Sequence, residues 1–185
     1  MKADIRTTRG VKEAFNRGVD IILHLAASTD VNRAFSNALY DFDVNVRGTL
    51  NVLSLAARAN VRRFVLLSSM RVFGRQQQLP IPEQAAKRPI DYHGQTKAMA
   101  ESLVLFFERT GRVPCWILRP TSVYGPYQES HGVSGVVSIF INRIIDGSLI
   151  TVYGGHQVRD FVYIGWLASW LSHQSDLVPC LRGGP

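Results

Sequence analysis

A short apolar run followed directly by two serines constrains this chain most. Phe64–Leu67 is a run of large apolar residues with polar neighbours on both sides, as in a strand that is buried on both faces. Ser68 and Ser69 stand where this strand is expected to end, and Lys97 follows in a segment with helical spacing. Open α/β sheets carry their chemistry at the carboxyl ends of parallel strands. We therefore expect the serine hydroxyl and the lysine to face one pocket.

Two further apolar runs have the same character, Val19–Leu25 and Val113–Arg119. Helical spacing of apolar residues predicts helices over 11–17, 38–60, 94–109 and 136–145. Loops are expected at 28–37 and 75–90, and a short strand at Leu149–Tyr153. Strands that alternate with helices in this way predict an α/β fold with a parallel sheet.

The composition is that of a soluble protein. The chain has 185 residues, of which 46% are hydrophobic and 19% charged. No apolar run reaches the roughly 18 residues that a membrane span needs, and the first residues lack the apolar segment of a signal peptide. Cys115 and Cys180 indicate neither a disulfide framework nor metal-ligand spacing. A cytoplasmic location without a metal or a membrane is therefore expected.

The formal net charge of +7 raises the question of a nucleic-acid partner. The lysines and arginines are scattered along the chain, and no run is longer than two, as in Arg62-Arg63. This pattern favours an ordinary solvated surface, with a few cations available to an anionic diphosphate substrate. No nucleic-acid partner is expected.

Five segments occur in an order that resembles a known family. They are HLAA at 24–27, SSMRVFG at 68–74, HGQTK at 93–97, RPTSVYGP at 119–126 and QVRDF at 157–161. Together they resemble the extended short-chain dehydrogenases/reductases, in particular the NAD-dependent nucleotide-sugar epimerases and dehydratases. The resemblance covers residues 1–172 and implies a Rossmann-like doubly wound parallel sheet with the start of a substrate-binding region. Residues 173–185 form a tail that is unlike the family.

The resemblance implies catalytic roles for Ser69, Lys97 and the residue four before Lys97. In the family that residue is a tyrosine, which removes a hydroxyl proton, while the lysine lowers its pKa and holds the ribose. Here it is His93, and the neighbouring Tyr92 lies about 140° around the helix from Lys97. A neutral imidazole can act as a base near pH 7. Two interpretations stay open: His93 replaces the tyrosine, or activity is reduced or lost.

An NAD cofactor is implied, with NADP not excluded. The residues implied to contact it are Asp4, Ile5, Leu25, Ala26, Ala27, Asn45, Ser68, Lys97 and Pro120. Without the resemblance, the two alanines would fit tight strand packing equally well, and His24 is expected to be a satisfied core histidine.

The glycine fingerprint of the GxxGxxG kind, which holds the cofactor pyrophosphate in this family, is absent before Val19–Leu25. Only 18 residues precede that strand. We therefore expect a fragment that lacks the first strands of the sheet, with a bare edge at this strand.

A nucleotide-diphosphate sugar is the implied substrate, with contacts from Ser69, Ser122 and Arg159. Arginine suits a diphosphate because its planar fork makes two parallel hydrogen bonds. Dehydratases of the family carry Asp-Glu where this chain has Met70-Arg71, which favours an epimerase or reductase. The resemblance also implies a homodimer through the helices at 38–60 and 94–109. A non-catalytic protein that binds a nucleotide sugar or pairs with a complete subunit, and a gene remnant without function, are the alternatives.

Overall fold

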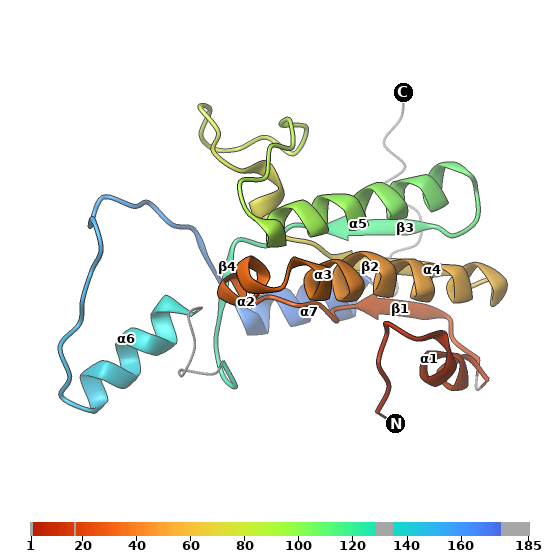
Figure 1. The fold of residues 1–185 in the computed structure, drawn as a ribbon, viewed down its shortest axis with the longest axis horizontal. Coiled ribbons are helices and arrows are strands. Elements are labelled where there is room, and N and C mark those ends of the chain that lie inside the picture. The colour runs from red at the N-terminus through yellow and green to blue at the C-terminus, as the bar shows by residue number, and fades with distance from the viewer. Residues whose placement is uncertain (1, 17, 129–134, 175–185) are drawn as a thin grey trace. The chain divides into compact units, whose positions relative to one another are not determined.

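A computed structural model describes residues 2–16, 18–128 and 135–174 (Figure 1). The chain forms two compact units, an N-terminal unit (Met1–Pro120) and a C-terminal unit (Thr121–Pro185). Most of the predicted tail, residues 175–185, lies outside the described residues. Across the described ranges, every helix is too short or too polar to span a bilayer.

The N-terminal unit contains a three-stranded parallel sheet. Its strands, in spatial order, are β1 (Ile21–His24), β2 (Arg63–Leu67) and β3 (Cys115–Leu118). Its helices are α1 (Thr8–Phe15), α2 (Val31–Ser36), α3 (Ala38–Phe42), the π-helix η1 (Asp43–Arg47), α4 (Gly48–Arg58), the 3₁₀-helix η2 (Met70–Phe73) and α5 (Tyr92–Arg109). This architecture confirms the predicted α/β class with part of a Rossmann-like parallel sheet. In the described part of the chain, β1 pairs with β2 alone and is an edge strand of this sheet.

The core of the N-terminal unit lies between the sheet and the pair α4 and α5, which run side by side over it (Figure 1). Phe64 at the centre of the sheet and Leu53 on α4 are fully buried, and Val104 on α5 joins them. Fully burying a side chain of this size contributes about 1.5–3 kcal/mol to the free energy of unfolding. The apolar run that predicted the central strand thus anchors both helices.

The helix predicted over 38–60 is present as three consecutive pieces, α3, η1 and α4. The wider π-helical turn of η1 contains Asn45, whose side chain is buried. Gly48, which follows, packs closely against Ile5. A Cβ added at Gly48 would lie 2.6 Å from Ile5 Cδ1.

Two predictions of local structure were wrong. The segment 28–37 was expected to be a loop, yet it contains α2, because the Asp30 carboxylate accepts a hydrogen bond from Arg33 N (3.1 Å) and caps the helix. Leu149–Tyr153 was expected to be a strand, yet it has no regular structure. Its apolar side chains stay exposed, Leu149 by 90% and Tyr153 by 82%, so no burial stabilises a strand there.

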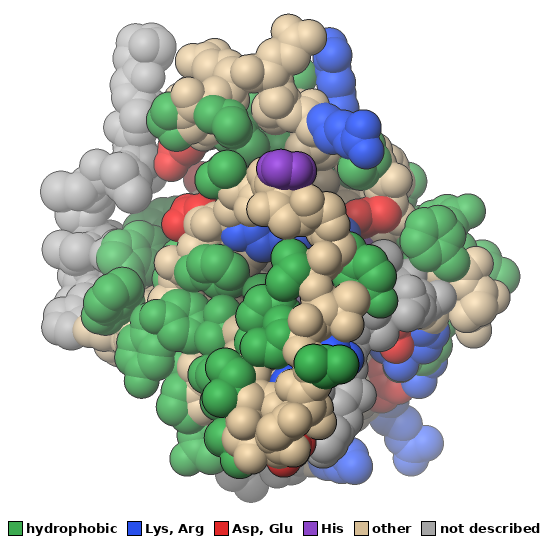
Figure 2. Space-filling model, turned by 90° about the vertical axis from the view of Figure 1, so that its left-hand side faces the viewer, with side chains coloured by type: hydrophobic (Ala, Val, Ile, Leu, Met, Phe, Trp, Pro, Cys, Tyr) green, Lys and Arg blue, Asp and Glu red, His purple; other side chains and the backbone are tan. Residues whose placement is uncertain are grey.

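The C-terminal unit is small and open. Its elements are β4 (Ser122–Tyr124), α6 (Val136–Ile145), β5 (Phe161–Tyr163) and α7 (Ile164–Gln174), with β4 and β5 paired in parallel. Tyr163 contacts the rings of Tyr124 and Trp166, with centroids 5.7 Å and 6.1 Å away. None of the residues of this unit that the structure describes is fully buried. Many hydrophobic side chains are uncovered on the surface drawn in Figure 2.

Candidate active site

The carboxyl end of β2 carries the two serines. Ser68 N donates to Leu118 O (2.7 Å), and Met70 N donates to Pro120 O (3.3 Å), so the ends of β2 and β3 are tied together. The Ser69 hydroxyl accepts a hydrogen bond from Arg71 N (3.2 Å) and caps η2. Ser68 is buried, whereas Ser69 is half-buried.

Lys97 on α5 reaches the same strand end. Its ammonium donates to Leu67 O (2.7 Å), two residues before Ser69, and the side chain is buried. Burial disfavours the charged form and lowers the pKa of Lys97 to about 8, although the carboxylate of Glu101 opposes this shift. The lysine therefore keeps its proton at pH 7 and places a positive charge at the carboxyl end of β2.

His93 lies one helical turn before Lys97, in the first turn of α5. Its ring is buried, and Nδ1 lies 3.0 Å from Ser28 O. A carbonyl can only accept, so a hydrogen bond here requires the proton on Nδ1, which would leave the lone pair on Nε2 of the neutral ring. Burial, and then the charge of Lys97, lower the pKa of His93. Tyr92, in contrast, is 47% exposed, with its ring edge-on to Phe35.

The first turn of α5 packs closely against η2. A Cβ added at Gly94 would lie 2.7 Å from Arg71 O, and the guanidinium of Arg71 pairs with Asp91 at 2.5 Å. Asp91 also caps α5 by accepting from Gly94 N (2.7 Å). A glycine at this position therefore lets the turn that bears Ser69 approach the turn that bears His93.

Asn45 connects three segments of the site. Its Oδ1 accepts from Ser28 N (2.8 Å), and its Nδ2 donates to Ser28 O (3.2 Å) and to Thr96 Oγ1 (2.9 Å). These hydrogen bonds connect the helix of Asn45 to the segment after β1 and to α5. Ser28 and Thr96 were missed, although each is next to a predicted residue, Ala27 and Lys97.

Comparison with known proteins places this arrangement in a family. The model of the NAD-dependent epimerase/dehydratase family matches residues 1–172. The chain belongs to this family. It thereby confirms the resemblance that five short segments indicated.

Relatives within the family include epimerases and dehydratases. The chain is 32% identical over 147 residues to UDP-glucose 4-epimerase of Mycolicibacterium smegmatis, covering 78% of this chain and 47% of that protein. It is also 32% identical over 165 residues to dTDP-D-glucose 4,6-dehydratase of Homo sapiens, covering 88% and 46%. The solved UDP-glucose 4-epimerase of Thermus thermophilus, in complex with NAD, matches with a TM-score of 0.85 and 29% identity, covering 96% of this chain and 59% of that one. The chain thus spans about half the length of the relatives it matches.

A buried carboxylate, that of Glu101, connects the ends of β2 and β3. This residue was not identified from the sequence. Glu101 on α5 is fully buried and accepts hydrogen bonds from Ser68 Oγ (2.5 Å) and from Arg119 Nε (2.8 Å) and Nη2 (3.0 Å). Lys87 from the loop before α5 pairs with it at 2.5 Å. Burial raises the pKa of Glu101, but the bonds from Arg119, Lys87 and Ser68 outweigh it and lower the pKa. Its spacing of four residues from Lys97 was the available signal.

The residues implied for the cofactor differ in exposure. Leu25 and Ala26 are exposed beyond the end of β1, and Ala27 is half-buried. Asp4 is exposed, and hydrogen bonds from Arg6 (2.5 Å to its guanidinium) lower the pKa of Asp4 to about 2. The end of β1 therefore leaves uncovered apolar surface, whereas the Asp4 carboxylate already has a cationic partner.

Of the three residues implied for the sugar nucleotide, Ser69 belongs to the N-terminal unit, whereas Ser122 and Arg159 belong to the C-terminal unit. Ser122 opens β4, and its backbone N donates to Asp160 O (3.1 Å). Arg159 comes one residue earlier and is exposed. The pairing of β4 with β5 thus brings Ser122 and Arg159 into one small region of that unit.

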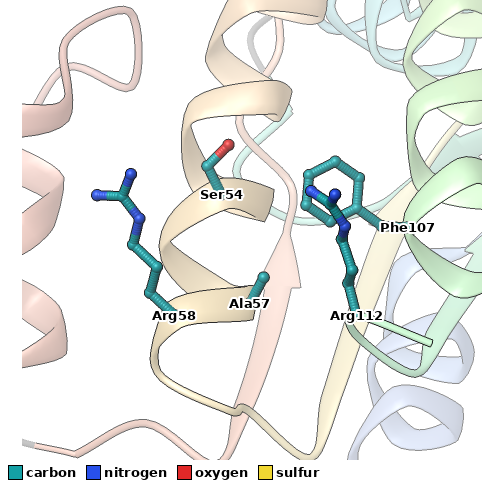
Figure 3. A pocket seen from close by; sticks show the side chains of 5 residues that line it. All are labelled: Ser54, Ala57, Arg58, Phe107 and Arg112. Carbon is teal, nitrogen blue, oxygen red and sulfur yellow. The ribbon is translucent and has the colours of Figure 1, made fainter. Parts of the chain in front are cut away.

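A separate pocket lies at the far end of α4 and α5 from Lys97. It has a volume of about 250 Å³, and its walls are Ser54, Ala57, Arg58, Phe107 and Arg112 (Figure 3). Ten residues of helix, or about 15 Å, separate Phe107 from Lys97. None of the residues predicted for catalysis lines this pocket, so it is not part of the candidate site.

Proposed function

We propose that the chain carries out, or derives from, the chemistry of an NAD-dependent nucleotide-sugar epimerase. One observation carries the proposal: the ammonium of Lys97 and the ring of His93 are each held on a backbone carbonyl, Leu67 O and Ser28 O, beside the turn of Ser69. A base, a cation and a hydroxyl around the ends of two neighbouring strands are what removal of a hydroxyl proton requires.

In this proposal His93, Ser69 and Lys97 have different roles. The Nε2 lone pair of His93 accepts the proton of the sugar hydroxyl, while Ser69 hydrogen-bonds the reacting oxygen. The charge of Lys97 favours the neutral ring and stabilises negative charge that develops on that oxygen. When bound, NAD would supply the acceptor for the hydride and later return it to the keto sugar.

The residues present fit one end of a dinucleotide. Lys97 has three N–H donors, and within the described ranges one of them has an acceptor, Leu67 O, so the other two would serve ribose hydroxyls. The exposed side chains of Leu25 and Ala26, with the small side chain of Ala27 next to them, suit the underside of a cofactor. Among the described residues ahead of β1 there is one helix, α1, with no strand or GxxGxxG turn before it, so the pyrophosphate lacks its usual family contacts within the described ranges. Affinity for NAD is therefore the first quantity to measure.

The sugar nucleotide is proposed to bind through its diphosphate. Arg159 supplies an exposed guanidinium, whose planar fork suits phosphate oxygens, and Ser122 supplies a hydroxyl. Relatives named for UDP-glucose and dTDP-D-glucose support this substrate class.

A homodimer in the cytoplasm is the proposed assembly and location. The helices over 38–60 expose Leu39 (77%), Phe42 (40%) and Leu50 (39%), while α5 exposes Met99 (39%) and Phe106 (47%). Leu39 and Phe42 are three residues apart, and Met99 and Phe106 are seven apart, so the members of each pair lie on one face of their helix, as a helix partner requires. Sedimentation velocity over a range of concentrations tests this, and a strictly monomeric chain would refute it.

A non-catalytic role is the second candidate, and the replacement of tyrosine by His93 favours it. An imidazole has less reach than a phenol, so the chain would then bind a nucleotide sugar or pair with a complete subunit without turnover. This candidate predicts ligand binding that is unaffected by changes at His93.

Titration with NAD, followed by tryptophan fluorescence and calorimetry, tests the proposal. Saturable binding that Lys97→Met weakens, with turnover of UDP-glucose that His93→Gln lowers about 10²-fold or more, is expected. Tyr92→Phe is the matched control and leaves both unchanged. The variant His93→Tyr recreates the family motif, and binding with turnover in this variant alone would favour the non-catalytic candidate. No binding of NAD at millimolar concentration would overturn the proposal.

A further inference from the structure

Ser28, directly after β1 and the two alanines, is a buried residue whose polar atoms all have partners. Its backbone N donates to Asn45 Oδ1 (2.8 Å), and its backbone O accepts from Asn45 Nδ2 (3.2 Å) and from His93 Nδ1 (3.0 Å). Its hydroxyl donates to Asp41 Oδ1 and accepts from Arg33 Nη2 (3.1 Å). Its side chain is 3% exposed. Five hydrogen bonds therefore fix this one residue.

The groups around Ser28 are themselves buried. Asp41 is 0% exposed, and its second oxygen, Oδ2, has no hydrogen-bond partner within the described structure. A buried carboxylate is costly unless its acceptors are used, so the bond from the Ser28 hydroxyl is strongly favoured. Asn45 is 2% exposed and is anchored a second time, on Thr96 Oγ1 (2.9 Å). The Ser28 carbonyl thus has little freedom to turn away from His93.

We propose that Ser28, held by Asp41 and Asn45, is a positioning residue that fixes His93 in the tautomer with the proton on Nδ1. The role of this tautomer in catalysis rests on the proposed function, because the tautomer leaves Nε2 able to take a proton. The tautomer itself follows from the hydrogen bonds around Ser28 and does not depend on catalysis.

The tautomer is fixed because a carbonyl oxygen accepts hydrogen bonds and cannot donate them. With the proton on Nε2 instead, Nδ1 and Ser28 O would be two acceptors 3.0 Å apart in a buried setting. A flipped ring would leave the carbonyl with the Asn45 amide alone. Either change loses a buried hydrogen bond, which corresponds to about a ten-fold preference or more for the tautomer with Nδ1 protonated.

Nitrogen NMR of the imidazole tests the inference without cofactor or substrate. The full chain is labelled with ¹⁵N-histidine and measured above the pKa of the ring, and the signals of His93 are those that disappear in His93→Gln. About a ten-fold or greater excess of the Nδ1–H form is expected. Ser28→Ala, which removes the bonds to Asp41 and Arg33, is expected to reduce this excess about three-fold, while the exposed neighbour Thr29→Ala leaves it unchanged.

The outcomes separate this inference from the proposed function. An Nε2–H ring in the unmodified protein overturns the inference whatever the activity, and this result needs no variant to fold. An excess that Ser28→Ala and Thr29→Ala change equally also overturns it. An Nδ1–H ring together with no affinity for NAD supports the inference while the proposed function fails.

Discussion

The two units of the chain differ in how much they bury, and this separates the parts of the candidate site. In the N-terminal unit, Phe64 and Leu53 are fully buried, and the hydrogen bonds of Lys97 and His93 lie against that core. In the C-terminal unit, the described residues include none that is fully buried, and Arg159 is exposed. Local stability follows burial. The geometry that we propose for catalysis is therefore held by the core of the N-terminal unit, whereas the proposed diphosphate contacts have no such support among the described residues of the C-terminal unit.

The largest expected difference between the units is at their phenylalanines. Phe64→Ala removes a ring that is 0% exposed, and loss of this burial with the resulting cavity should lower the free energy of unfolding by about 3–5 kcal/mol. Phe161→Ala removes a ring that is 40% exposed and contacts Tyr124, which should cost about 1 kcal/mol. Urea unfolding monitored by circular dichroism measures both. Equal losses would show that the C-terminal unit has a core as stabilising as that of the N-terminal unit.

The next largest change in the free energy of unfolding is expected at the buried carboxylate of Glu101. Glu101→Gln leaves Arg119 and Lys87 facing a neutral amide, but both cations reach water, with side chains 21% and 29% exposed. The free energy of unfolding should fall by about 2 kcal/mol, below the full cost of breaking a buried ion pair. Asp146→Asn, at an exposed position of the C-terminal unit, should change it by less than about 0.5 kcal/mol.

The pH dependence of the free energy of unfolding adds a further test of Glu101. The pKa of Glu101 is lowered in the fold from its ordinary value of 4.5, so its stabilising effect is present above pH 4.5 and is lost as the pH falls. The difference between the wild type and Glu101→Gln should therefore shrink in acid. A difference that is constant from pH 7 to pH 4 would contradict the ionised carboxylate.

Burial of Lys97 is expected to lower the free energy of unfolding at pH 7, whereas Glu101 raises it. Its pKa falls from 10.5 to about 8 in the fold, so the folded state binds fewer protons than the unfolded chain between these values. The free energy of unfolding should therefore rise with pH from about 8 to about 10.5. Lys97→Met should stabilise the chain at pH 7 by roughly 1–2 kcal/mol, after the loss of the bond to Leu67 O is included, and it should remove the rise.

Thermal and urea unfolding from pH 7 to pH 10 measure the effect of Lys97→Met. Lys12→Met, at an exposed position, is the control and should keep the rise. If Lys97→Met destabilises the chain at every pH, its ammonium is a structural support rather than a strained functional group.

The sequence predicted what depends on local patterns. The apolar runs located β1, β2 and β3, because burial on both faces gives a strand a continuous apolar run. The spacing of apolar residues located α5 and α6, because burial of one face gives a helix a period of about 3.6 residues. Resemblance to the family supplied Ser69, Lys97 and Asn45 as candidates.

The contacts around Ser28 and Glu101 could not be predicted in this way. Asp41 and Ser28 are 13 residues apart, and His93 and Ser28 are 65 apart, so no periodicity connects them. The helix α2 was missed for a related reason, because its cap is a single hydrogen bond to Asp30 rather than a pattern.

The smallest expected effect on stability tests the open surface of the C-terminal unit. Ile144 on α6 is 66% exposed, so Ile144→Ser should change the free energy of unfolding by less than about 0.5 kcal/mol. Removing an exposed apolar side chain should instead reduce self-association, measured by light scattering against concentration. Val104→Ser, at a buried position of α5, is the contrasting variant and should destabilise the fold strongly. A loss of stability at Ile144 as large as that at Val104 would mean that α6 is covered in solution, and the contrast between the two units would then no longer hold.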